Sequence, residues 1–166
     1  VTVLGVVYIG VLGAHAALLL SIPDLGTGLL TAAILVTVAY DVGGLVVGRT
    51  AGRTPLSAAS PNKTVEGLVG GCVAAIGVGL LMGFLGKPAP VADLPGGFRE
   101  ALILGVVAAV VAPIGDLAES LLKRDLGIKD MGAILPGHGG VLDRFDALLF
   151  VLPATYYVAL LTDILG

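Results

Sequence analysis

SLLKRDLGIKDMGAILPGHGGVLDRFD, residues 120–146, is a polar, glycine-bearing segment in an otherwise apolar chain. On each side of it lies an apolar run long enough to cross a bilayer, which takes about 20 residues. The segment carries cations that suit phosphates, carboxylates that suit a metal ion, and glycines that let a ligand approach the backbone. This pattern predicts a pair of membrane helices whose connecting segment is functional.

The composition sets the fold class. Only 13% of the 166 residues are charged and 57% are hydrophobic, with a mean hydropathy of +1.05. Soluble domains carry roughly 25% charged residues, so this composition excludes a water-soluble domain. The apolar stretches are continuous, whereas the strands of a membrane barrel alternate apolar and polar residues. We therefore expect an all-α, polytopic membrane protein.

Five apolar runs are candidates for transmembrane helices. They cover residues 1–20, 27–48, 66–85, 98–122 and 146–164, with polar loops at 49–65 and 123–144. The chain begins inside an apolar run, without Met and without the basic flank of a signal peptide. We expect a single transmembrane domain over residues 1–166 that is the C-terminal part of a longer protein, whose N-terminal spans are absent here.

Basic residues gather on one side of the predicted bundle. The two polar loops hold Arg49, Arg53, Lys63, Lys123, Arg124, Lys129 and Arg144. The other side has Lys87 and Arg99. Because cytoplasmic loops are enriched in Lys and Arg, we expect both polar loops to face the cytoplasm.

Two aspartates lie within predicted spans, where a buried charge is costly and usually functional. Asp41 either pairs with Arg49 or belongs to a polar site inside the bundle, and we favour the polar site. Asp116 begins one polar helix face at i, i+3, i+4 and i+7, made of Asp116, Glu119, Ser120 and Lys123. An amphipathic helix end with a Glu119–Lys123 pair would explain those two residues but not Asp116.

Further carboxylates and a cation stand at predicted helix starts. Asp143 and Asp146 open the last span, where the helix dipole alone would favour one of them. Since Asp116 and Asp143 lie at the cytoplasmic ends of consecutive spans, their carboxylates can converge on Mg²⁺, which needs few protein ligands. In SPNKTVEG, residues 60–67, Thr64 is a predicted N-cap. Lys63 beside it is either an anion site or a membrane anchor.

These motifs resemble the signature of the phosphatidate cytidylyltransferase family, also called CDP-diacylglycerol synthases. The pattern is S-x₂-KR-x₄-KD-x-G-x₂-LP-x-HGG-x₂-DR-x-D over residues 120–146, and every fixed position is filled. SPNKT-x-EG at 60–67 and GDL-x-ES at 115–120 resemble two further motifs. Val65 stands where many members have Trp, and the resemblance covers nearly the whole chain.

The resemblance implies an enzyme that makes CDP-diacylglycerol and pyrophosphate from CTP and phosphatidate. It implies that the chain is a catalytic domain which needs Mg²⁺, held by Asp116 and Asp143, with room for a second cation. The implied catalytic residues are Asp116, Lys123, Arg124, Asp143 and Arg144. The implied substrate-binding residues are Ser60, Asn62, Lys63, Thr64, Glu66, Ser120, Lys129, His138, Gly139, Gly140 and Asp146.

The resemblance also implies a homodimer in the inner, cytoplasmic membrane, with the active site on the cytoplasmic side and no nucleic-acid partner. Three alternatives stay open at this point. A homologous enzyme could use CTP with another lipid phosphate, such as an archaeal ether lipid. A transporter or channel could use the intramembrane Asp41 and Asp116. An inert packing fragment would respond to no ligand.

Overall fold

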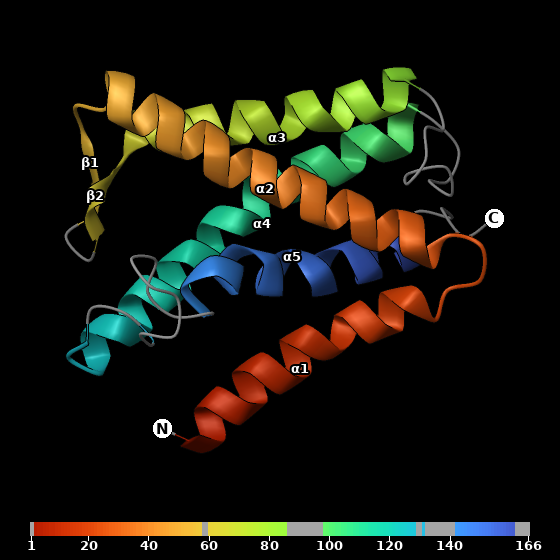
Figure 1. Cartoon of the computed structure of the whole chain (residues 1–166), viewed down its shortest axis with the longest axis horizontal. Helices are drawn as coiled ribbons and strands as arrows, with labels where there is room; N and C mark the ends of the chain where they lie inside the picture. Colours follow the sequence, from red (N-terminus) through yellow and green to blue (C-terminus); the bar gives the residue numbers. More distant parts are fainter. Residues whose placement is uncertain (1, 58–59, 86–97, 129–130, 132–141, 162–166) are drawn as a thin grey trace.

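The computed structural model describes residues 2–57, 60–85, 98–128, 131 and 142–161 (Figure 1). Within these residues the chain forms five helices and one short pair of strands. The elements are α1 (Thr2–Leu20), α2 (Gly26–Ala51), β1 (Pro55–Ser57), β2 (Ser60–Thr64), α3 (Val65–Leu85), α4 (Phe98–Asp125) and α5 (Leu142–Leu161). Each predicted apolar run is a helix, which confirms the all-α class.

Length and composition support a membrane chain. The helices α2, α3 and α4 are each long and apolar enough to cross a bilayer. The first and last helices of the chain contain shorter apolar stretches, Gly5–Leu20 in α1 and Phe145–Leu161 in α5. Three of the five predicted spans therefore meet the criterion, and full spanning by α1 and α5 stays a prediction.

Small residues let the central helices approach closely. A Cβ built on Gly71 of α3 would lie 2.8 Å from the ring of Tyr40 of α2, and one on Gly79 would lie 2.7 Å from the carbonyl oxygen of Ala101 of α4. Gly43 of α2 faces Ala74 of α3 in the same way. These glycines thus allow the close packing of helices that is common in membrane proteins.

Two boundaries differ from the sequence-based expectation. Residues 49–65, expected as a loop, contain the antiparallel strands β1 and β2, in which Pro55 is opposite Thr64. The last helix begins at Leu142 rather than at residue 146, so Asp143 lies in its first turn. Hydropathy located only the apolar part of this helix, whereas its polar first turn is favoured by the helix dipole.

Candidate active site

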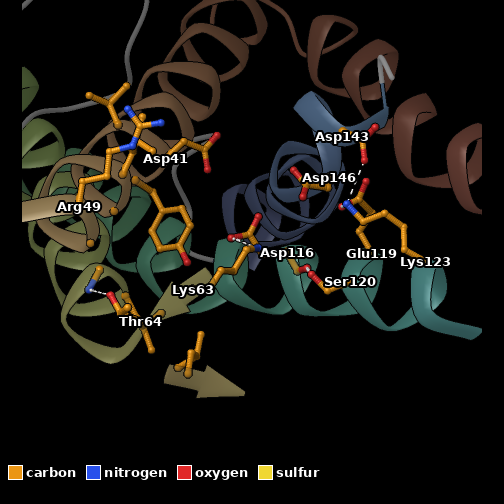
Figure 2. Close-up of a pocket in the computed structure, with 18 residues that line it drawn as sticks. Asp41, Arg49, Lys63, Thr64, Asp116, Glu119, Ser120, Lys123, Asp143 and Asp146 are labelled. Atoms are coloured by element: carbon orange, nitrogen blue, oxygen red, sulfur yellow. Dashed lines mark hydrogen bonds and ion pairs between the residues drawn. The ribbon is translucent and has the colours of Figure 1, made fainter. Parts of the chain in front are cut away.

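The C-terminal parts of α2 and α4, the first turns of α5 and the strand β2 line a half-open cavity of about 830 Å³ (Figure 2). Its charged lining residues are Asp41, Arg49, Lys63, Asp116, Glu119, Lys123, Asp143 and Asp146. Residues more than 100 positions apart in the sequence therefore share one space. Asp116 and Asp143 both line this cavity, and the convergence of their carboxylates on one metal ion stays a prediction.

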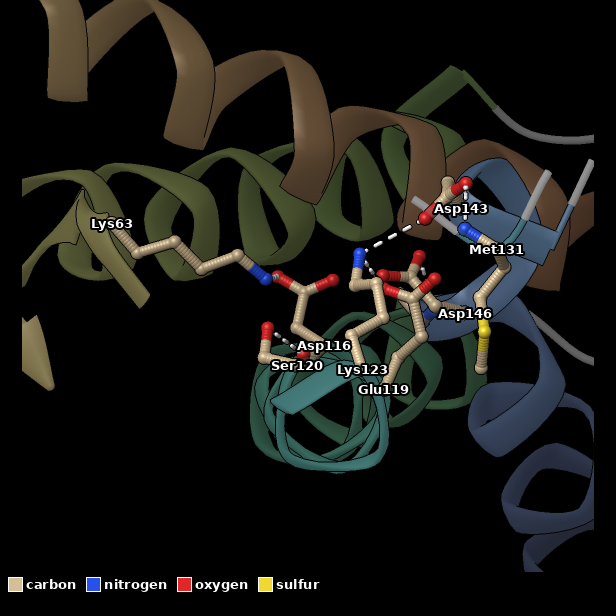
Figure 3. A network of polar contacts seen from close by, with 9 residues as sticks. Lys63, Asp116, Glu119, Ser120, Lys123, Met131, Asp143 and Asp146 are labelled. Atoms are coloured by element: carbon tan, nitrogen blue, oxygen red, sulfur yellow. Dashed lines mark hydrogen bonds and ion pairs between the residues drawn. The ribbon is translucent and has the colours of Figure 1, made fainter. Parts of the chain in front are cut away.

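The α4 wall of the cavity is the polar face predicted from the spacing. Asp116, Glu119, Ser120 and Lys123 all line the cavity. Ser120 is only 7% exposed, and its hydroxyl donates a hydrogen bond of 2.8 Å to the backbone oxygen of Asp116. This bond holds the serine against its own helix, with its carboxylate and lysine neighbours directed into the cavity (Figure 3).

Lys63 joins the strand pair to α4. Its Nζ lies 2.8 Å from Oδ2 of Asp116. The position of Lys63 is fixed from both sides, because Thr64 caps α3 by accepting a hydrogen bond of 3.1 Å from the Gly67 amide. The predicted N-cap is confirmed. Lys63, which the sequence left open as an anion site or a membrane anchor, here holds a carboxylate of the opposite wall.

Lys123 joins α4 to α5. Its Nζ lies 2.6 Å from Oε2 of Glu119 and 2.9 Å from Oδ1 of Asp143. The other oxygen of Asp143 accepts a hydrogen bond of 3.0 Å from the Met131 amide. The expected Glu119–Lys123 pair is present, and it also reaches the neighbouring helix (Figure 3).

Asp146 brings a further carboxylate into the cavity. It is 8% exposed, and its Oδ1 accepts a hydrogen bond of 2.8 Å from the Ala147 amide. Its side chain also lies within hydrogen-bonding reach of Asp116. The α5 residue next to Asp116 is thus Asp146, whereas Asp143 is held by Lys123.

Glu66 has a clear role in holding the backbone. Its Oε2 accepts hydrogen bonds of 3.1 Å from the amides of Arg53 and Thr54, and its Oε1 accepts one of 2.9 Å from the Thr54 hydroxyl. These bonds fix the turn between α2 and β1. Substrate binding by Glu66 stays a prediction, and the contacts seen give it a positioning role.

The remaining predicted residues form two groups. Arg124 is exposed at the end of α4, outside the cavity lining. Lys129, His138, Gly139 and Gly140 lie outside the described residues, as do the side chains of Ser60, Asn62 and Arg144. The cavity also holds Tyr40, Arg49 and Glu119, to which the sequence assigned no site role. For Glu119 the signal was present, since it lies three residues after Asp116.

The α4–α5 side of the cavity suits a divalent cation. Four carboxylates, those of Asp116, Glu119, Asp143 and Asp146, meet two lysines there. Glu119 is 2% exposed, and its Oε1 has no hydrogen-bond partner among the described residues. A buried carboxylate oxygen without a partner is costly even when the other oxygen is paired, as here with Lys123, so a cation would relieve it.

The donor set suits magnesium in particular. Within the described residues, no three His, Cys, Asp or Glu side chains form a ready-made metal site. Mg²⁺ does not require one, because it commonly binds one or two carboxylates and completes its shell with water and substrate phosphates. The carboxylates present therefore fit the predicted ion.

Comparison with known proteins bears on the chemistry. The sequence model of the cytidylyltransferase family matches residues 1–162. The chain is 48% identical over 127 residues to a phosphatidate cytidylyltransferase of Helicobacter pylori, covering 76% of this chain and 45% of that protein. Enzymes with the same name from Synechocystis and Bacillus subtilis are 44% identical over 129 residues and 38% identical over 156 residues.

These alignments cover 77% and 93% of this chain, and 42% and 56% of the Synechocystis and Bacillus proteins. The chain thus spans about half the length of the curated relatives it matches.

Proposed function

Because this chain belongs to the cytidylyltransferase family, we propose that it transfers the cytidylyl group of CTP to phosphatidate, giving CDP-diacylglycerol and pyrophosphate. One observation carries the proposal. Lysines and carboxylates from α4, α5 and β2 meet in a cavity that is large enough for a nucleotide. The family match favours a transferase over a transporter that uses Asp41 and Asp116.

The reaction is a displacement at phosphorus. A phosphate oxygen of phosphatidate attacks the α-phosphorus of CTP, the bond to the bridging oxygen of the β-phosphate breaks, and pyrophosphate leaves. The attacking group needs no general base, because a phosphate monoester with a second pKa of about 6 is largely ionised at neutral pH. Such transfers depend on positioning and charge stabilisation.

The lysines supply both the positioning and the charge stabilisation. Lys63 and Lys123 are held at opposite sides of the α4 face by their carboxylate partners, and each can donate charge-assisted hydrogen bonds to phosphate oxygens. Mg²⁺ held by Asp116 and Asp143, with a second cation where the substrate brings one, would neutralise the phosphate charge. Glu119 keeps Lys123 directed toward the cavity through their ion pair, and Lys63 does the same for Asp116.

The proposal includes the location of the site. Arg49, Arg53, Lys63, Lys123 and Arg124 lie at the end of the bundle that holds the cavity, which supports a cytoplasmic site in the inner membrane. There CTP from the cytoplasm meets the lipid headgroup. A homodimer is part of the proposal through the resemblance alone.

Substitution of the proposed metal ligands tests the function. In the full-length protein, Asp116→Asn and Asp143→Asn should each lower Mg²⁺-dependent formation of CDP-diacylglycerol at least about 100-fold, since transition-state charge would lose its stabilisation. Asp24→Asn, an acid outside the cavity, should leave the rate unchanged. Full activity in either cavity variant would overturn the metal assignment. Higher turnover with another lipid phosphate would replace phosphatidate as the substrate.

A further inference from the structure

The cavity has a second side that the transfer chemistry does not use. Asp41 and Arg49 line it from α2, apart from the carboxylates of α4 and α5 (Figure 2). The eight residue steps from one to the other correspond to about 12 Å along the helix axis. The α2 side, defined by Asp41 and Arg49, is therefore long enough to receive a group of its own.

The walls of the α2 side are largely apolar. Leu45 comes from α2, Leu56 from β1 and Leu68 from α3. Tyr40 is 6% exposed, with its ring packed against Gly71, and closes the side toward α3. Asp41, Leu45 and Arg49 are exposed, so this side is open to the surroundings of α2. An apolar lining with one carboxylate and one guanidinium is the usual composition of a site for a small organic group with a few polar atoms.

The charge of Asp41 restricts the group that can lie beside it. A carboxylate repels the phosphates of CTP and of phosphatidate. An acyl chain offers no hydrogen-bond donor to it. Among the parts of the two substrates, the nucleoside alone carries uncharged donors, which are the cytosine amino group and the ribose hydroxyls. It also carries ring acceptors that an arginine can bind.

We propose that the α2 side of the cavity binds the nucleoside of the nucleotide substrate, with the Asp41 carboxylate accepting hydrogen bonds from its amino or hydroxyl groups. The inference rests on the proposed cytidylyl transfer and adds the residue that selects the nucleoside. In this arrangement the triphosphate extends from α2 toward Lys63 and Lys123. The reacting phosphorus then lies on the α4–α5 side of the cavity.

Binding measurements on the purified full-length protein in detergent test the proposal. CTP and inorganic pyrophosphate, each with Mg²⁺, are titrated into the wild type, Asp41→Asn and Asp24→Asn. Because a neutral amide replaces the charged acceptor, Asp41→Asn should weaken CTP binding roughly 10-fold. Pyrophosphate has no nucleoside, so its affinity should not change. Asp24→Asn, an exposed acid at the other end of α2, should match the wild type for both ligands.

Two analogues distinguish the donors. UTP lacks the amino group, and dCTP lacks the 2′-hydroxyl. The wild type should discriminate against the analogue that lacks the group bound by Asp41, and this preference should fall to within about two-fold in Asp41→Asn, because a site built around one hydrogen bond rejects ligands without its partner.

Other outcomes overturn the proposal. Tighter binding of both CTP and pyrophosphate by Asp41→Asn would place Asp41 beside phosphates. An equal loss for both ligands would mean that Asp41 maintains the shape of the cavity, and unchanged CTP affinity would remove it from the site. Failure of the proposed function gives a different result, since the wild type itself would then not bind CTP.

Discussion

Lys123 connects the two helices that carry the candidate active site. Its ammonium group contacts Glu119 of its own helix and Asp143 of α5, and its side chain is 19% exposed. Glu119 is the more buried partner, at 2%. Glu119 therefore depends on Lys123 to compensate a negative charge that water does not reach.

Removal of Lys123 should destabilise the protein. Lys123→Met leaves Glu119 buried beside Asp143 without a cation, and losing one partner of such a pair costs about 3 kcal/mol. Unfolding in mixed detergent micelles without Mg²⁺ measures the change. The double variant Lys123→Met/Glu119→Gln should recover part of the loss, because it removes the uncompensated charge. Losses that simply add would contradict this account.

At the residue scale, local spacing predicted the positions of side chains within one element. It did not predict the ion pairs between residues far apart in the sequence. The cavity-facing set on α4 follows from helical periodicity, and the Thr64 cap follows from residue type and position. The Lys63–Asp116 ion pair joins residues 53 positions apart, so it depends on how the strands fold over α4. Asp146 was expected as a substrate contact, and its position beside Asp116 became visible only with α5 in place.

The strand pair is the element that places Lys63. Glu66 holds the turn before β1 by accepting hydrogen bonds from the amides of Arg53 and Thr54. The Val65 amide donates a hydrogen bond of 2.9 Å to the Thr54 oxygen. The strands are only three and five residues long. Two isolated short strands are marginal by themselves, so their anchoring at α3 is important for the site.

Glu66→Gln should loosen this element while leaving the helices intact. An amide has one acceptor oxygen, so it cannot serve all three donors of the turn. Hydrogen exchange should become faster at Arg53, Thr54 and Val65, and CTP affinity should fall because Lys63 is less well placed. Glu100→Gln is the matched control, since Glu100 also lies in the first turn of a helix. Unchanged exchange at the turn would show that the carboxylate is dispensable.

The close packing of α2 on α3 leads us to predict how two glycine substitutions change the stability of the protein. Gly71→Ala places a methyl group 2.8 Å from the Tyr40 ring, and such overpacking costs about 1–3 kcal/mol. Gly77→Ala in the same helix meets nothing within 4 Å and should be neutral or slightly stabilising. Thermal unfolding of the two variants in detergent compares them. Equal melting temperatures would contradict the packing account.

Elements with strong periodicity or long apolar runs could be predicted from the sequence, and marginal ones could not. The five helices follow from hydropathy, but the β1–β2 pair depends on hydrogen bonds that Glu66 accepts and that no local pattern shows. The start of α5 was missed because its first turn is polar, and polar residues are compatible with a helix wherever they face a cavity.

The whole molecule has two chemically different ends. The strand pair and the last turn of α4 lie at one end in Figure 1, and the turn between α1 and α2 lies at the other. Of the described basic residues, Arg99 alone is at the end opposite the cavity. Composition predicted the fold class, and charge distribution predicted this polarity. The arrangement of helices around the cavity required the three-dimensional structure.

Orientation in the membrane is the property on which delivery of the substrates depends. The proposed substrate CTP is supplied from the cytoplasm, so we expect the cavity to open there, and the positive-inside rule predicts the same direction. Ser21, after α1, and Thr50, in the last turn of α2, are suitable labelling positions at the two ends of the bundle. Both are exposed, and each hydroxyl donates a hydrogen bond to a carbonyl of its own chain, at 2.7 Å to Leu18 and 2.8 Å to Val46.

Cysteine labelling tests this orientation in cells. Cys72 is first replaced by Ala, which removes its packing against the core and a bond of 3.2 Å from its Sγ to the Ala109 oxygen. Against that background, a membrane-impermeant maleimide should label Ser21→Cys in intact cells. Thr50→Cys should be labelled only in inverted vesicles or after the membrane is opened. The reverse pattern would put the cavity outside, where neither CTP nor the cytoplasmic leaflet could supply it, and would contradict the proposed reaction as well as the topology.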